Sequence, residues 1–228
     1  MKTVWTAAVA EFLGTFALCF IGAGAICTNQ WTGGAVGLLG IAVAHGTVLA
    51  VMISALGHIS GGHFNPAVTL GILTAKKISG QTASAYLLAQ LAGASAAGYL
   101  LAYIVPYRVW APVHLGTPAL SPGIMMPQAI LLETVLTFFL VLAVFGTAVD
   151  PNGSWSAVGG FGIGTVLIFD ILVGGPLTGA SMNPARTFGP ALASGFWDNH
   201  AVYWIGPILG GVLAGSLYRS VFLGSKKR

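Results

Sequence analysis

Two short stretches of the sequence share the tripeptide Asn-Pro-Ala. They read His58-Ile-Ser-Gly-Gly-His63-Phe-Asn65-Pro66-Ala67-Val-Thr69 and Ser181-Met-Asn183-Pro184-Ala185-Arg186-Thr-Phe-Gly-Pro190. In each, Asn-Pro-Ala opens a short apolar segment, at about 66–75 and 184–194. Asparagine is among the best helix N-caps, and proline fits the first helical position because its missing N–H costs nothing there. We therefore predict that each motif begins a half-helix too short to cross a bilayer.

The surroundings of the two motifs also repeat. Glu11-Phe-Leu-Gly-Thr-Phe in the first half corresponds to Glu133-Thr-Val-Leu-Thr-Phe in the second. Asn65 follows Glu11 by 54 residues, and Asn183 follows Glu133 by 50 residues. Matched landmarks at a nearly constant interval indicate an internal repeat. We expect a single transmembrane channel domain over 1–228, built from repeats at about 4–105 and 128–223.

The composition places the chain in a membrane. Of its 228 residues, 56% are hydrophobic and only 6% are charged, whereas soluble domains are about 25% charged. Disordered chains lack apolar residues, so disorder is excluded as well. The net charge of +4 does not indicate a nucleic-acid partner, because the basic residues gather at the ends of apolar stretches and not on one face.

Six apolar stretches are long enough to span a bilayer. They lie at about 4–28, 35–57, 82–105, 128–148, 158–177 and 201–223. Their length without dyad alternation predicts helices and not barrel strands. The first stretch carries Glu11, which a secretory signal would avoid, so we interpret it as a span. Cys19 and Cys27 are eight residues apart on that helix, too far to form a disulfide with each other, and we expect them to be packing residues.

Each repeat holds three spans, so the two repeats must have opposite orientations in the membrane. Paired short segments in an inverted repeat indicate a site at the midplane. Seven basic residues fall on one side of the membrane: Lys2, Lys76, Lys77, Arg219, Lys226, Lys227 and Arg228. Only Arg108 and Arg186 fall on the other side. By the positive-inside rule, both termini are expected to be cytoplasmic.

The meeting of two half-helix starts predicts a specific chemistry. Each asparagine can cap its helix with its side-chain oxygen and keep its NH2 group as a donor. Two such donors would orient a passing water, and the positive dipole ends would repel cations, including hydronium. The alternative is that Asn65 and Asn183 are two buried caps that close loops. A single motif would favour that alternative, but two motifs in matched positions favour a pore.

At this point the sequence resembles the aquaporin (major intrinsic protein) family over essentially its whole length. The resemblance implies an all-α membrane protein with six tilted transmembrane helices, two re-entrant half-helices and one pore in each subunit of a homotetramer. It implies water and small neutral solutes as partners, besides membrane lipid, and no cofactor, metal or nucleic acid.

The resemblance also places a four-residue selectivity filter at His45, Ile171, Ala180 and Arg186. A lone arginine in a membrane segment needs a functional reason; the alternative is an interface residue. The set departs from the Phe, His, Thr and Arg of strict water channels and lacks the glycerol-facilitator pattern. It is similar to tonoplast-type aquaporins, many of which also pass ammonia or urea.

The resemblance assigns further roles. A loop histidine, His114, would be a fifth filter member that holds Arg186 aside; the alternative is a solvated loop residue. Glu11 and Glu133 would accept hydrogen bonds from the re-entrant loops, and His58 with His63 would brace the first loop. No third ligand accompanies these histidines, so we do not expect them to bind a metal ion. Asp170 is unexpected beside Ile171; it could bond to the outer loop or be protonated by burial.

Three other functions are considered. A glycerol-type facilitator shares the architecture, and a proton-coupled secondary transporter also uses inverted repeats, with Glu11, Glu133 and Asp170 as possible proton carriers. An intramembrane enzyme would need a nucleophile such as Ser60, yet Ser60 lies in a glycine-rich loop that matches the channel signature. The sequence therefore favours a passive water channel, with additional permeability to ammonia or other small neutral solutes and exclusion of protons and ions.

Overall fold

A computed structural model describes residues 3–153 and 158–223 of the chain. Over these ranges it is helical, and six helices are long and apolar enough to cross a membrane. They are α1 (Val4–Trp31), α2 (Gly37–Ser60), α4 (Gly80–Ile104), α6 (Met126–Val144), α7 (Gly159–Thr178) and α9 (Val202–Leu217). Helix α6 continues in a π-helical turn at Phe145–Val149, and α9 in another at Tyr218–Leu223. The six predicted spans are confirmed, with ends within about three residues.

The two short segments are helices as well, and they begin at the predicted prolines. They are α3 (Pro66–Thr74) and α8 (Pro184–Ser194). Asn65 Oδ1 accepts a hydrogen bond from the Ala67 N–H at 2.8 Å. Asn183 Oδ1 accepts from Ala185 N–H at 3.0 Å and from Arg186 N–H at 3.2 Å. Side-chain capping by asparagine thus starts both half-helices, as the sequence predicts.

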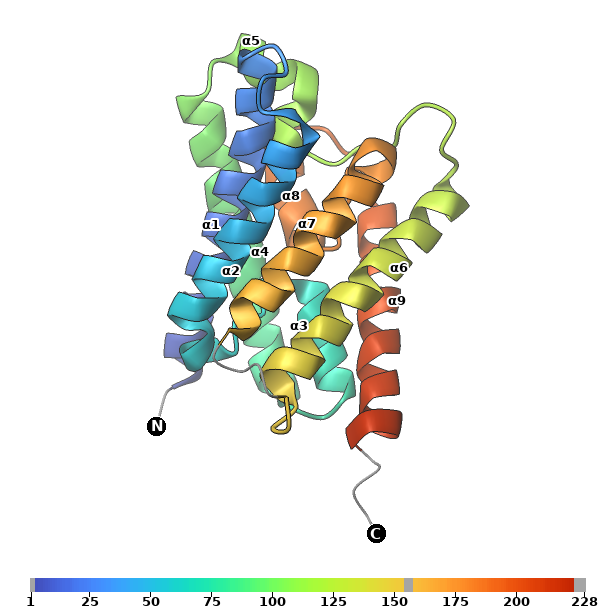
Figure 1. Ribbon diagram of the computed structural model, residues 1–228. Helices are drawn as coiled ribbons and strands as arrows, with labels where there is room; N and C mark the ends of the chain where they lie inside the picture. Colours follow the sequence, from blue (N-terminus) through green and yellow to red (C-terminus); the bar gives the residue numbers. More distant parts are fainter. Residues whose placement is uncertain (1–2, 154–157, 224–228) are drawn as a thin grey trace.

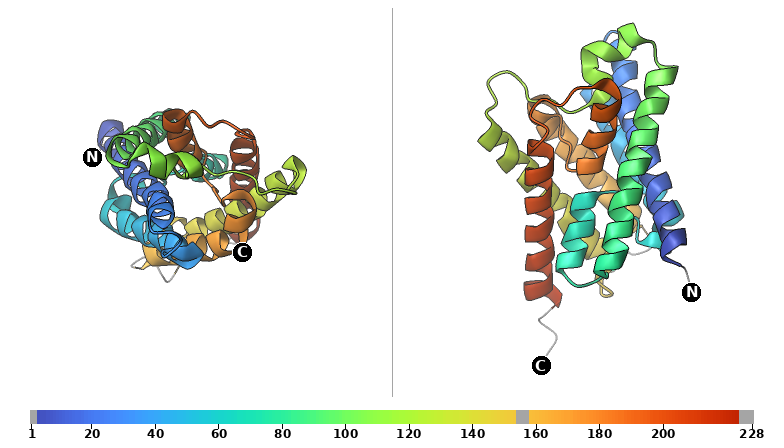
Figure 2. Two further views of the ribbon diagram at one scale, coloured as in Figure 1. Left: turned by 90° about the horizontal axis from the view of Figure 1, so that it is seen from above. Right: turned by 180° about the vertical axis from the view of Figure 1, so that it is seen from behind.

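The helices are arranged with an internal two-fold correspondence. Helix α1 packs against α2 and α4, as α6 packs against α7 and α9. Each half-helix packs on the third span of the other repeat, α3 on α9 and α8 on α4. Figures 1 and 2 show α3 and α8 entering from opposite ends and meeting in the middle of the bundle. The inverted arrangement therefore places both motif starts at mid-depth.

Glycines allow the half-helices to approach the spans closely. A Cβ on Gly211 of α9 would lie 2.4 Å from the carbonyl oxygen of Ala67, and one on Gly215 would lie 2.3 Å from that of Gly71. On the other side, a Cβ on Gly189 of α8 would lie 2.2 Å from the Ala94 carbonyl oxygen. Such distances are too short for any side chain, so backbone contact between these helices requires glycine.

A helical outer loop that was not predicted connects α4 to α6. It comprises α5 (Tyr107–Trp110) and a 3₁₀ segment, η1 (Ala111–Gly116). Segment η1 contacts α1 and α8, at the end of the molecule opposite to the start of α1 (Figure 1). The loop thereby packs against the half-helix that carries Arg186.

Candidate functional site

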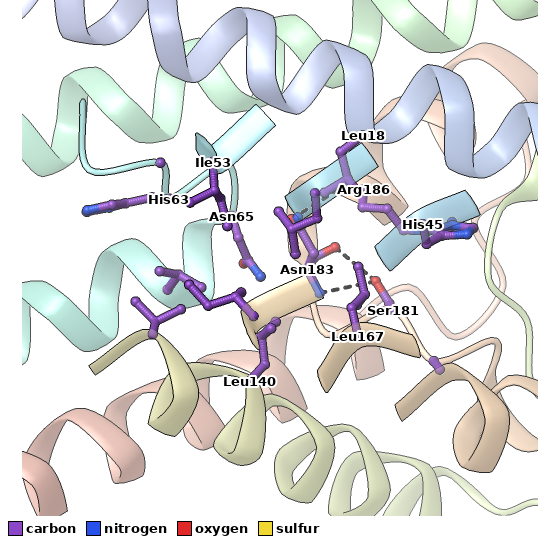
Figure 3. A pocket seen from close by; sticks show the side chains of 16 residues that line it. Leu18, His45, Ile53, His63, Asn65, Leu140, Leu167, Ser181, Asn183 and Arg186 are labelled. Atoms are coloured by element: carbon purple, nitrogen blue, oxygen red, sulfur yellow. Dashed lines mark hydrogen bonds between the residues drawn. The ribbon is translucent and has the colours of Figure 1, made fainter. Parts of the chain in front are cut away.

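The two motif asparagines bind each other's loops. Asn65 Nδ2 donates to the carbonyl of Met182 at 2.8 Å, and Asn183 Nδ2 donates to the carbonyl of Phe64 at 2.9 Å. Figure 3 shows the two amides together in the middle of the cavity. An amide NH2 group has two protons. The sequence analysis predicted that the whole NH2 group would stay available to a passing molecule. In the structure, one proton of each amide forms a hydrogen bond that joins the two repeats.

Two buried glutamates hold the loops that lead into the half-helices. Glu11, fully buried, accepts hydrogen bonds from the N–H groups of His63 and Phe64 at 2.9 and 2.7 Å. Glu133, also fully buried, accepts from Ser181 N–H at 2.9 Å and Met182 N–H at 2.7 Å. A carboxylate is acceptor-only, so it suits consecutive backbone donors in a loop that has no helical partners for them.

Hydroxyl groups complete both networks. Ser60 Oγ donates to Glu11 at 2.6 Å, as Thr178 Oγ1 donates to Glu133 at 2.8 Å. Tyr86 donates to the Ser60 carbonyl and Tyr203 to the Thr178 carbonyl, each at 2.7 Å. The sequence did not predict this role for Ser60, and it did not single out Thr178, Tyr86 or Tyr203. The two tyrosines occupy equivalent positions in the third span of each repeat, and this match could have indicated their shared role.

Between the loops lies a narrow cavity. Its polar lining comes from His45, His63, Asn65, Asn183, Arg186 and Ser181, together with Gly62 and Ala180 of the loops. The remaining lining is apolar, supplied by Leu18, Leu49, Ile53, Val68, Leu140, Val144, Ile163 and Leu167. In Figure 3 the two asparagines separate His63 on one side from His45 and Arg186 on the other. The cavity therefore offers few polar groups along an apolar wall.

His45 and Arg186 form the outer limit of this cavity. They also line a second, outer cavity, which Ile171 lines as well. Arg186 Nη2 lies 3.2 Å from His45 Nε2, and Arg186 Nη1 donates to the carbonyl of Gly116 at 2.7 Å. His45 Nδ1 is 2.8 Å from the carbonyl of Ile41. Because that oxygen can only accept, Nδ1 carries the proton and Nε2 accepts from Arg186.

Among the four predicted filter residues, His45 and Arg186 contact each other, Ala180 lines the inner cavity and Ile171 the outer one. The structure does not bring the His114 ring to either cavity lining. That ring stacks on Phe196, with centroids 3.7 Å apart. The arginine is held on the loop side by the Gly116 carbonyl, a backbone group that residue types alone do not reveal.

Two further predicted residues lie outside this centre. His58 is exposed on the last turn of α2 and lines a separate inner pocket with Gly61 and Thr147. Asp170 is buried, and its Oδ2 has no hydrogen-bond partner within residues 3–153 and 158–223. It therefore makes no described bond to the outer loop. In the same ranges, no three His, Cys, Asp or Glu side chains are placed to hold a metal ion.

Six spanning helices, two capped half-helices and a cavity through their meeting point define a membrane channel. Residues 1–218 match the family described as Major intrinsic protein. The chain is 46% identical to Aquaporin TIP4-4 of Zea mays over 95% of its length and 86% of that protein. It is 49% identical to Aquaporin TIP4-1 of Arabidopsis thaliana, over 95% and 86% respectively. The chain belongs to the major intrinsic protein family, whose members are channels and not enzymes.

The fold is also that of a solved relative. The X-ray structure of the aquaglyceroporin from Plasmodium falciparum has a TM-score of 0.82 to this chain at 25% sequence identity, covering 97% of this chain and 98% of that one. Aquaporin TIP2-1 of Arabidopsis thaliana is 41% identical over 96% of this chain and 88% of its own length. The predicted fold class and the predicted family are confirmed.

Proposed function

We propose that this protein is a passive channel for water that also admits ammonia and excludes protons and other ions. The observation that carries the proposal is the pair of asparagine amides at the meeting point of α3 and α8, inside a cavity limited by His45 and Arg186. Each amide retains one proton for a passing molecule. The four motif residues Pro66, Ala67, Pro184 and Ala185 support this arrangement from the first turns of the half-helices.

The proposed mechanism follows from the direction of the donors. A water at the centre would turn its oxygen toward Asn65 and Asn183, so its protons would point along the pore in opposite directions. Hydrogen bonding between central waters is thereby interrupted, and the helix dipoles raise the energy of a cation at the same point. The apolar wall offers few competing partners, so water passes without being held.

The solute range is proposed from the outer constriction. Ile171 and Ala180 are small or aliphatic, whereas His45 and Arg186 keep the constriction polar. A small neutral molecule with hydrogen-bonding capacity can use the polar side and fit against the aliphatic side. Ammonia meets these conditions. Glycerol, the solute of the alternative function, needs a wider apolar wall than His45 leaves.

Stopped-flow measurement on proteoliposomes tests this function, with water, ammonia and glycerol compared side by side. We expect osmotic water flux that rises linearly with the gradient at low activation energy, ammonia flux above that of empty liposomes, and little glycerol flux. A pH-sensitive dye should report no proton leak. Saturable flux driven by a pH gradient would instead support a transporter, and fast glycerol flux would support a facilitator.

Asn183→Ala offers a sharper variant. It removes one central donor and one helix cap while Asn65 stays. We expect lower water flux per folded protein and a measurable proton leak. Wild-type behaviour in both measurements would contradict the mechanism.

The wider architecture is part of the same proposal. Residues 1–228 would form one channel domain with repeats at about 4–105 and 128–223, and Glu11, Glu133 and His58 would brace the re-entrant loops. Four copies would assemble in the membrane, each with its own pore, and both termini would face the cytoplasm. Of the basic residues behind that orientation, Lys2, Lys226, Lys227 and Arg228 lie outside the described residues.

A further inference from the structure

An unusual turn in the outer loop brings one backbone carbonyl to Arg186. His114, Leu115 and Gly116 are all left-handed, with φ of 47°, 55° and 73°. This conformation is unfavourable for residues that carry a side chain, and it persists only where the surroundings hold it. The Gly116 carbonyl that ends the turn accepts from Arg186 Nη1 at 2.7 Å. The place of that carbonyl therefore depends on what fixes the turn.

Three contacts fix the turn. Leu115 is fully buried in an apolar cluster between α1 and α4. Thr117 Oγ1 donates to the carbonyl of His114 at 2.6 Å. The ring of His114 lies flat on the ring of Phe196, with centroids 3.7 Å apart and planes 7° apart. The Leu115 contact joins the turn to α1 and α4, and the Thr117 contact lies within the loop. The ring stack joins the turn to the segment after α8.

Helix α8 consequently touches the turn at both of its ends. Arg186 lies in its first turn and binds the Gly116 carbonyl. Ser194 is its last residue, and its Oγ lies 3.4 Å from Thr117 Oγ1. Phe196 follows two residues later. An α-helix has a fixed rise per residue, so attachment at both ends sets where the turn lies relative to the guanidinium.

We propose that Phe196 is a positioning residue for the outer constriction. By stacking on His114 it holds the turn together with the Leu115 and Thr117 contacts, and the Gly116 carbonyl then holds one arm of Arg186. The proposal rests on the proposed role of Arg186 in selecting solutes. His114 contributes a flat ring to this arrangement and not a ring nitrogen to the solute, which is the alternative role that the family resemblance suggests.

Loss of the stack has a defined consequence. Without Phe196 the turn keeps the Leu115 and Thr117 contacts but loses the one at His114, so the Gly116 carbonyl is held less firmly and the guanidinium of Arg186 becomes more mobile. The size limit of the constriction then weakens for larger neutral solutes more than for water. One hydrogen bond lost from the constriction corresponds to a change of about fivefold in relative permeability. We therefore expect the urea-to-water permeability ratio to rise by about that factor in Phe196→Leu.

Four variants in proteoliposomes test the proposal. His114→Phe keeps a flat ring without nitrogens and should retain the wild-type urea-to-water and ammonia-to-water ratios. His114→Ala and Phe196→Leu should both raise the urea-to-water ratio, and the double variant should raise it no further, because both act on one contact. Trp197→Leu is the matched control, since its ring packs on Phe188 and His200 and not on the turn.

A spectroscopic measurement separates positioning from general damage. The Phe196 ring current should shift the His114 ring protons upfield in the NMR spectrum of the wild type, and Phe196→Leu should remove the shift. Loss of ammonia flux in His114→Phe, with wild-type ratios in Phe196→Leu, would overturn the proposal in favour of a filter histidine. A wild type without water flux would refute the proposed function, and the ring-current shift would still decide whether the stack exists.

Discussion

Arg186 concentrates the selectivity of the outer constriction in one side chain. It is 3% exposed and divides its donors between Gly116 and His45. Arg186→Val removes the hydrogen bonds to Gly116 and His45 and the positive charge that repels cations. We expect urea flux to rise several-fold and a proton leak to appear, measured by stopped flow and a pH-sensitive dye. Arg186→Lys is the control: it keeps the charge but not the planar fork, so protons should stay excluded while size selectivity falls.

Asp170 is a buried acidic residue whose replacement should change stability and not flux. Its carboxyl is 2% exposed, and Oδ2 has no partner among the described residues. A buried carboxylate without a partner is costly, and asparagine keeps the shape without the charge. We expect Asp170→Asn to keep its water flux and to raise the midpoint of thermal unfolding by about 2–4 °C, which corresponds to about 1 kcal/mol for a chain of this size. A lower midpoint would mean that the carboxyl is bound in the assembled channel.

Glycine permits the close contact between half-helix α3 and the spanning helix α9. Helix α9 meets α3 backbone to backbone, because a Cβ on Gly211 would lie 2.4 Å from the Ala67 carbonyl oxygen. Gly211→Val must push the two helices apart, and we expect it to abolish the folded channel. Fluorescence-detected size exclusion in detergent measures this. The matched control is Gly80→Val, where a Cβ meets nothing within 4 Å; equal loss in both variants would contradict the packing argument.

Glu133 stabilises the second re-entrant loop through hydrogen bonds. Glu133 accepts hydrogen bonds from Thr178, Ser181 and Met182. Glu133→Gln turns one acceptor oxygen into an NH2 group that faces a donor. Bonds to a charged group contribute about 1.5–3 kcal/mol each, so we expect a loss of about that size. Thermal unfolding in detergent measures it, and an unchanged midpoint would show that the loop holds without the carboxylate.

Both ends of the described chain lie at the same end of the helix bundle, which bears on the side of the membrane that the termini face. Helix α1 begins, and the turn Tyr218–Leu223 ends, at the same end of the bundle (Figure 1). Arg219 lies there too, because its Nη1 donates to the Thr74 carbonyl at the end of α3 at 3.3 Å, and Lys76 and Lys77 follow directly. We expect tags at either terminus to be inaccessible to antibody in intact cells and accessible after permeabilisation. Labelling of either tag in intact cells would refute the proposed orientation.

Local sequence encodes the helices of this protein. Six apolar lengths match the thickness of a bilayer, and Asn65-Pro66 and Asn183-Pro184 carry their own cap and first helical residue, so each of these elements is encoded locally. The interval between Glu11 and Asn65, nearly repeated between Glu133 and Asn183, revealed the repeat, and the three spans in each half predicted that it is inverted. The repeat in turn placed the two motifs at the same depth without any coordinates.

Which polar groups contact one another depends on the packing of the whole chain. Asn65 binds a carbonyl 117 residues away, and Arg186 binds one 70 residues away. Both acceptors are backbone oxygens, which every residue has, so no residue type marks them in the sequence. The left-handed turn His114–Gly116 is held by contacts with residues distant in the sequence: Leu115 packs between α1 and α4, and the His114 ring stacks on Phe196. Such contacts depend on how closely glycine lets the helices approach, and packing, not local sequence, sets that distance.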